Sequence, residues 1–126
     1  MEIIIVKNNT YKTKTIFCDI DGTLIKHHGS LSKQLTRKPE ILEGVIEKFD
    51  EWDRKCYNII LTTGRKESLR RITENQLAEL GLVYDQLIMG IGGGPRILIN
   101  DIKPSGLKTA FSVNLERNKG IRDVQL

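Results

Sequence analysis

The chain has 126 residues, a length typical of one domain, and we expect a single domain over residues 1–126. Its 20 basic and 16 acidic side chains give a net charge of +4. This charge suits an anionic ligand, but the chain lacks the basic stripe with interleaved aromatics that is typical of nucleic-acid modules.

Membrane and secretion signals are also missing. No apolar stretch approaches the ~20 residues that span a bilayer, and the N-terminus does not have the pattern of a signal peptide. The two cysteines, Cys18 and Cys56, show no metal-ligand spacing, and we interpret them as buried free thiols. These observations favour a cytoplasmic protein with no membrane partner.

The first part of the chain predicts two strands and a loop. Residues 2–6 are apolar and predict a strand, which the polar segment 7–14 could join as a hairpin to a second strand over residues 15–20. The Asn8-Asn9 pair is the turn signal in this hairpin. Residues 26–38 have no clear hydrophobic period and predict an irregular loop.

Two helices and a strand follow. Pro39 suits the first turn of a helix, and apolar residues recur at helical spacing from there to Cys56. Residues 58–62 predict a short buried strand. A second helix is predicted over about residues 66–80, with Gly81 where a C-terminal glycine cap belongs.

The last part of the chain predicts three more strands, over residues 86–89, 97–100 and 109–115. Strands that alternate with helices indicate an α/β fold with a mostly parallel sheet. The glycine-rich segment 90–95 does not match Gly-x-Gly-x-x-Gly and has no helix after it, so we interpret it as a flexible connection.

Two carboxylates follow the strand over residues 15–20. Side chains two apart on a strand share a face, so Asp19 and Asp21 can point into one crevice. Ligand sites of open parallel sheets lie just beyond the carboxyl ends of their strands. The pair therefore predicts divalent-metal and acid/base chemistry.

Two further strand ends carry polar groups. Thr63, Gly64 and Arg65 lie where a strand enters a helix, a geometry that binds anions through free backbone amides and the helix dipole. Asp101 adds a third carboxylate after residues 97–100. Carboxylate and carbonyl oxygens are the ligands that suit magnesium.

The three motifs together resemble the signature of the haloacid dehalogenase (HAD) superfamily of aspartate-nucleophile phosphatases. They are Asp19-Ile20-Asp21-Gly22-Thr23, Thr63-Gly64-Arg65 and Ile99-Asn100-Asp101, and the resemblance covers about residues 15–115. It implies a three-layer, Rossmann-like core with a five-stranded, mostly parallel sheet. The strand order is then 5-4-1-2-3, with residues 15–20 as strand 1 and residues 109–115 as strand 5.

The resemblance also implies roles for individual residues. Asp19 resembles the nucleophile that forms an aspartyl-phosphate, and Asp21 resembles the general acid and base. The implied Mg²⁺ ligands are Asp19, Asp21 through its backbone carbonyl, and Asp101. The implied phosphate-binding residues are Thr63, Gly64 and Arg65. The basic residue that neutralises the phosphate is Arg96 in our first choice, with Arg65, Lys66 and Lys103 as alternatives.

No cap domain fits between the motifs. Capless members resemble enzymes that act on bulky substrates or that complete their site by forming a homo-oligomer. We expect a Mg²⁺-dependent phosphomonoester hydrolase acting on a phosphorylated small molecule, such as a sugar phosphate of polysaccharide biosynthesis. Two alternatives stay open: a polynucleotide end phosphatase or nucleotidase, motivated by the basic residues of segment 26–38, and a phosphate-binding domain without turnover.

Overall fold

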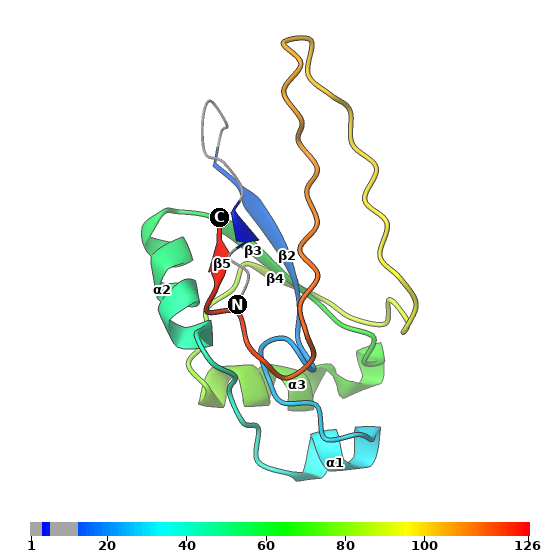
Figure 1. The fold of residues 1–126 in the computed structure, drawn as a ribbon. Helices are drawn as coiled ribbons and strands as arrows, with labels where there is room; N and C mark the ends of the chain where they lie inside the picture. Colours follow the sequence, from blue (N-terminus) through cyan, green and yellow to red (C-terminus); the bar gives the residue numbers. More distant parts are fainter. Residues whose placement is uncertain (1–3, 6–12) are drawn as a thin grey trace.

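The computed structural model describes residues 4–5 and 13–126. Its central sheet has three parallel strands, β2 (Thr15–Asp19), β3 (Asn58–Thr62) and β4 (Gln86–Ile88), in the order β2-β3-β4 (Figure 1). Asp19 pairs with Thr62, and Thr62 pairs with Ile88. The carboxyl ends of the three strands therefore lie at one edge of the sheet, as the sequence predicts.

A second, two-stranded sheet joins the two ends of the chain. Within it, β1 (Ile4–Ile5) runs parallel to β5 (Val124–Gln125). The described part of the predicted strand 2–6 thus pairs with β5 rather than with β2, so the predicted hairpin pairing with residues 15–20 is wrong. The predicted turn at Asn8-Asn9 lies outside the described residues.

The first long helix begins later than predicted. Helix α2 spans Val45–Arg54, and residues 39–44 are not helical, because Ile41 forms an antiparallel bridge with Ile25. The helix starts after Gly44, whose φ of +81° is readily adopted by glycine but is unfavourable for other residues. A Cβ at this position would overlap the backbone of Arg122. A contact distant in sequence, which no local pattern reveals, therefore sets the helix start.

The segment 26–38 is also more ordered than predicted. It contains a short helix, α1 (Leu31–Thr36), whose N-cap Ser30 accepts a hydrogen bond from the amide of Lys33 at 3.2 Å. The second predicted helix is confirmed as a 3-10 turn, η1 (Glu67–Leu69), followed by α3 (Arg70–Glu79). Gly81 follows the end of α3 and its C-cap Leu80, and it has the positive φ of a glycine cap.

The hydrophobic core lies between the sheet and the two long helices. Helix α2 contributes Phe49 and Trp52, whose rings lie 5.4 Å apart, and α3 contributes Leu77. Cys18 is buried among these residues, and this burial raises the pKa of its thiol to about 12. The thiol of Cys56 is exposed, so its prediction as a buried residue is wrong.

The predicted strands 97–100 and 109–115 are not part of the sheet, so the five-stranded order 5-4-1-2-3 is wrong beyond its 1-2-3 portion. Residues 96–115, which we name the arm, extend away from the sheet and return (Figure 1). The arm turns at residues 103–107, where the amide of Lys103 donates to the carbonyl of Leu107 at 3.0 Å.

The connection into the arm explains why residues 97–100 do not join the sheet as a parallel strand. Residues 89–95 are all that separates β4 from the arm, whereas a parallel strand needs a crossover of a dozen or more residues. Its beginning is also fixed, because Gly90 donates to the carbonyl of Arg65 at 2.7 Å and Ile91 donates to that of Thr63 at 3.3 Å. No helix in the described residues is long and apolar enough to cross a membrane.

Candidate active site

A tight turn after β2 places Asp19 and Asp21 at the carboxyl edge of the sheet. Between them, Ile20 is fully buried, and its carbonyl accepts the amide of Leu24 at 2.9 Å. Gly22 has φ +90° and donates to the carbonyl of Ile25 at 2.7 Å. Because Ile20 is anchored in the core, the two acidic side chains flank a rigid position.

Asp21 is held by hydrogen bonds to both carboxylate oxygens. Arg65 donates from Nε to Oδ2 and from Nη2 to Oδ1, each at 2.8 Å, which is the bidentate geometry of a strong ion pair. Gln34 of α1 donates to Oδ1 at 2.8 Å. The orientation of this carboxylate is therefore set by groups from two other parts of the chain.

Arg65 is itself buried, with 5% of its surface exposed. Its Nη1 donates to Thr73 at 3.0 Å and to Gln76 at 2.7 Å, both on α3. Gln76 in turn donates to the backbone carbonyl of Gln34 at 3.0 Å. A buried guanidinium needs such partners, since an unpaired buried charge is strongly destabilising.

These contacts bear on the role predicted for Arg65. Its guanidinium is already engaged with Asp21, Thr73 and Gln76, so the geometry favours a positioning residue for Asp21. Its contact with phosphate stays a prediction. The sequence reasoning missed Gln34, Thr73 and Gln76. The signal for the last two was their position four residues before Leu77 and Leu80, within the apolar face of α3. Segment 26–38 gave no such signal for Gln34.

Asp19 has a different environment. Desolvation by the surrounding groups raises the pKa of its carboxyl group above the ordinary value, and the nearby charge of Asp21 raises it further. Hydrogen bonds from Thr23 Oγ1, at 3.1 Å, and from the amide of Ile20 act in the opposite direction, as does the charge of Arg96. The two acids of the site are thus distinguished by their surroundings.

Arg96 acts electrostatically on Asp19, although the two lie far apart in sequence. Its side chain is exposed, and its Nη1 donates to the carbonyl of Gly94. Among the alternatives, Lys66 is exposed, and Lys103 pairs with Asp101 at 3.7 Å. The position of Arg96 is consistent with the predicted neutralising role, which stays a prediction.

The predicted phosphate-binding turn packs against the glycine-rich loop. Thr63 is 2% exposed, and its Oγ1 accepts the backbone amide of Arg65 at 3.1 Å. Gly64 is exposed, and a Cβ added there would lie 2.8 Å from the carbonyl oxygen of Gly92. The glycine at this position therefore permits close approach of the loop to the turn.

Asp101 is not brought to the other two carboxylates. It lies in the arm with 72% of its side chain exposed, and Thr109 donates to its backbone carbonyl at 2.8 Å. Among the described residues, no three acidic, His or Cys side chains are grouped so that they could hold a metal ion. The set implied for Mg²⁺, which is the carboxylates of Asp19 and Asp101 with the backbone carbonyl of Asp21, is therefore not assembled in the described part of the chain.

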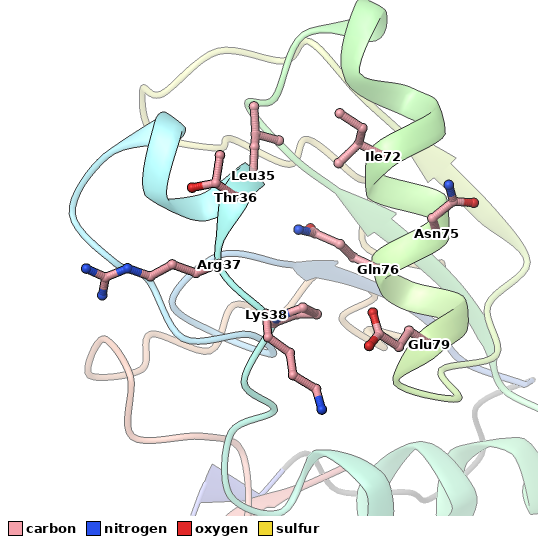
Figure 2. Close-up of a pocket in the computed structure, with 9 residues that line it drawn as sticks. Leu35, Thr36, Arg37, Lys38, Ile72, Asn75, Gln76 and Glu79 are labelled. Atoms are coloured by element: carbon pink, nitrogen blue, oxygen red, sulfur yellow. The ribbon is translucent and has the colours of Figure 1, made fainter.

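A groove of about 420 Å³ lies beside the site, between α1 and α3. Figure 2 shows Gln76 pointing from α3 toward α1, between Ile72, which faces Leu35, and Glu79. Gln76 lines this groove and also accepts a hydrogen bond from Arg65. The groove therefore lies on the α3 side of the Arg65–Asp21 ion pair. It does not include Asp19 or Asp21.

We expect replacement of Arg65 to destabilise the protein. Arg65→Ala would leave Asp21, Thr73 and Gln76 without their partner, at a cost of roughly 3–5 kcal/mol in the free energy of unfolding. Arg65→Lys keeps the charge but loses the bidentate geometry, so its loss should be smaller. Chemical denaturation measures both, with the exposed Arg71→Lys as the control. Wild-type stability in Arg65→Ala would contradict the assigned contacts.

We expect Asp19→Asn to stabilise the protein at neutral pH. Folding raises the pKa of Asp19 above its ordinary value of 3.8. At pH values between 3.8 and the raised pKa, the folded protein therefore binds more protons than the unfolded chain. At pH values above this range, ionised Asp19 therefore lowers the free energy of unfolding. This loss of stability disappears when the pH falls below the ordinary pKa. Melting temperatures of wild type and Asp19→Asn at pH 7 and near pH 3.5 measure the effect.

The surface variant Asp50→Asn, on α2, is the control for this comparison, since its partner Arg54 is equally exposed. A wild type that is more stable than Asp19→Asn at pH 7 would show that the carboxylate is not desolvated as described.

Comparison with known proteins gives matches among solved structures. No family model matches the chain, and no curated protein does. A chain of the Pnkp1/Rnl/Hen1 complex is 26% identical over 76% of this chain, with a TM-score of 0.56. A chain in another structure of this RNA repair complex is 27% identical over 69% of this chain, with a TM-score of 0.54.

The chain spans only 34% and 29% of the lengths of those two chains. A protein from Vibrio cholerae is 21% identical, with a TM-score of 0.51, over 74% of this chain and 85% of its own. This last likeness concerns the fold alone. The matched folds and the placement of the Asp19 and Thr63 motifs at adjacent strand ends show that the chain has a HAD-like fold.

Proposed function

We propose that the protein is a phosphomonoester hydrolase that uses Asp19 as its nucleophile. The observation that carries this proposal is the pair of acids at the carboxyl edge of the sheet, where buried Arg65 fixes Asp21 beside Asp19. Two carboxylates with distinct surroundings are the arrangement that divides nucleophilic and acid/base roles between them.

The proposed reaction has two steps. In the first, a carboxylate oxygen of Asp19 forms a bond to phosphorus and the bond from phosphorus to the leaving oxygen breaks. Asp21, which carries a proton on Oδ2 when the cycle begins, gives that proton to the leaving oxygen. In the second, Asp21 takes a proton from water, whose oxygen attacks phosphorus and releases Asp19 and inorganic phosphate. Asp21 returns to its starting state, so atoms and protons balance over the cycle.

The contacts of Asp21 suit this role. Its Oδ1 accepts two hydrogen bonds, from Arg65 and Gln34, whereas Oδ2 accepts one, from Arg65 Nε. A carboxylate oxygen has two lone pairs, so Oδ2 retains one for proton exchange. We propose that Arg65 positions this oxygen and that Arg96, Thr63 and the amide of Gly64 bind the phosphate.

Mg²⁺ is the proposed cofactor, on the strength of the motif resemblance. The described residues bring Asp19 and Asp21 together but leave Asp101, the other carboxylate implied as a ligand, in the arm, so no step of the reaction is assigned to the ion. The requirement is tested directly, by adding and chelating the metal.

We expect Asp19→Asn to abolish hydrolysis of an aryl phosphate. Asparagine can keep the contact with Thr23 but cannot attack phosphorus, so kcat should fall by about 10³-fold or more. Asp21→Asn should also lose turnover because the leaving oxygen receives no proton. Steady-state assays with Mg²⁺, and with a chelator, measure these effects, and Asp50→Asn is the control. Undiminished turnover in Asp19→Asn would refute the proposal.

The leading substrate class is a small sugar phosphate, which we propose from the resemblance to capless HAD enzymes. A polynucleotide phosphate end is the second candidate, because two matched structures belong to an RNA repair complex. The basic side chains of segment 26–38, including Lys26, Lys33 and Arg37, would suit a polyanion.

Salt dependence should distinguish the two classes. For a phosphorylated oligonucleotide that contacts several phosphates, kcat/KM should fall steeply between 50 mM and 200 mM salt. For a sugar phosphate, we expect a shallow dependence. The comparison uses both substrates over the same salt series, with the aryl phosphate as the reference. A higher kcat/KM for oligonucleotides at low salt, together with a steep decline, would reverse the preferred assignment.

A further inference from the structure

Residues 116–119, which we name the clasp, hold the turn that carries Asp21. The backbone amide of Asn118 in the clasp donates to the carbonyl of Gly22 at 2.8 Å. The Oδ1 atom of Asn118 accepts the amide of His27 at 2.7 Å, and its Nδ2 atom donates to the carbonyl of His27 at 3.2 Å. Three hydrogen bonds from one residue therefore join the clasp to a segment distant in sequence.

The clasp is also fixed at its other end. Ile121, two residues after it, is buried in the hydrophobic core, and its amide donates to the carbonyl of Glu43 at 2.9 Å. Within the clasp, Asn118 has φ +64°, a left-handed conformation that asparagine tolerates better than most residues. A side chain carried by the clasp therefore starts from a backbone position that is set on both sides.

The clasp places Arg117 against Gly22, the residue that directly follows Asp21. A Cβ added to Gly22 would lie 3.2 Å from the Cγ atom of Arg117 and 3.7 Å from its Nε atom. Arg117 is exposed, and its guanidinium group forms no hydrogen bond or ion pair with the residues that the structure describes. A basic group with unused donors thus lies at the margin of the active site.

His27 supplies a second donor beside Gly22. Its Cβ atom lies 3.7 Å from the position that a Cβ of Gly22 would take. The amide of Gly29 donates to Nδ1 of His27 at 2.9 Å, so the proton of the neutral ring lies on Nε2. This Nε2–H group is a donor in both the neutral and the charged ring, and it has no partner in the described part of the chain.

The position of Arg117 indicates which part of a substrate it can reach. Arg96, and not Arg117, is the arginine whose charge acts on Asp19. Arg117 therefore lies farther from the position of the phosphoryl group that Asp19 would attack. A guanidinium group presents paired donors that match the oxygens of a carboxylate or a phosphate. A second anionic group of the same substrate is the chemistry that fits this place.

We propose that Arg117 and His27 form a subsite for a second anionic group, a carboxylate or a phosphate, on a small phosphomonoester. The proposal rests on the proposed function and narrows its substrate class to esters that carry a further negative charge. Asn118 is the positioning residue of this subsite, because its hydrogen bonds set the place of Arg117 before the substrate arrives. Such preorganisation reduces the entropy that binding would otherwise lose.

The first test measures binding and requires no turnover. The probes are alkylphosphonates of several chain lengths whose far end carries a hydroxyl, a carboxylate or a second phosphonate, titrated by calorimetry with Mg²⁺ present. For at least one length, we expect wild type to bind an anionic probe about 10-fold more tightly than the hydroxyl probe. Arg117→Gln should remove this preference. The carboxylate and phosphonate ends show which of the two anions the subsite favours.

Lys119→Gln is the matched control, since Lys119 is exposed in the same clasp and its replacement removes the same charge. This variant should keep the preference for anionic probes. Three results would overturn the proposal: wild type shows no preference at any chain length, the preference survives in Arg117→Gln, or both variants lose it equally. The last result would show a general effect of positive charge rather than a subsite.

The second test compares kcat/KM for the corresponding phosphate esters. Asn118→Gly keeps the left-handed backbone accessible but removes both side-chain bonds to His27. We expect it to lower the ratio of kcat/KM between anionic and hydroxyl esters although Arg117 is present. An equal fall for both esters would assign Asn118 a structural role only.

The two tests separate the subsite from the proposed function. Hydrolysis of all the esters without any preference for a second charge would overturn the subsite and leave the phosphatase assignment intact. Binding of anionic probes that depends on Arg117, together with no hydrolysis of any ester, would refute the proposed function and leave the subsite standing.

Discussion

The ion pair between Asp21 and buried Arg65 is the interaction on which the rest of the site depends. It joins the end of β2 to the turn after β3, and through Thr73 and Gln76 it fixes α3 against both. Gln34 links α1 to the same carboxylate. Four segments distant in sequence therefore meet at this ion pair. Asp21 and the two residues of α3 supply the partners without which the buried guanidinium would be strongly destabilising.

The second acid of the site, Asp19, is exposed and has fewer partners. Desolvation raises the pKa of Asp19, whereas Arg96 and Thr23 only partly offset that effect. One carboxylate is thus oriented by strong partners, and its neighbour is left available with few. This asymmetry is what a nucleophile beside a proton-transfer group requires, because the nucleophile must be free to form a bond.

The arm shows how a short connection can redirect a fold. Residues 90–96 are tied to Thr63 and Arg65 at their start, which fixes the point from which the arm leaves the sheet. The arm carries Ile97 and Ile99 away from the sheet and leaves them exposed. Asp101 belongs to the arm and is therefore held apart from Asp19 and Asp21.

The sequence by itself determined the parallel strands 15–19 and 58–62, the helix ending near Gly81 and the meeting of the Asp19 and Thr63 motifs at one edge, because local periodicity and turn residues specify each of them. The tertiary structure alone decided that Arg65 holds Asp21, that α2 starts after Gly44 and that the arm leaves the sheet. The partners of a buried guanidinium, the backbone lying against Gly44 and the reach of a connection depend on segments far apart in the chain. No local pattern contains that information.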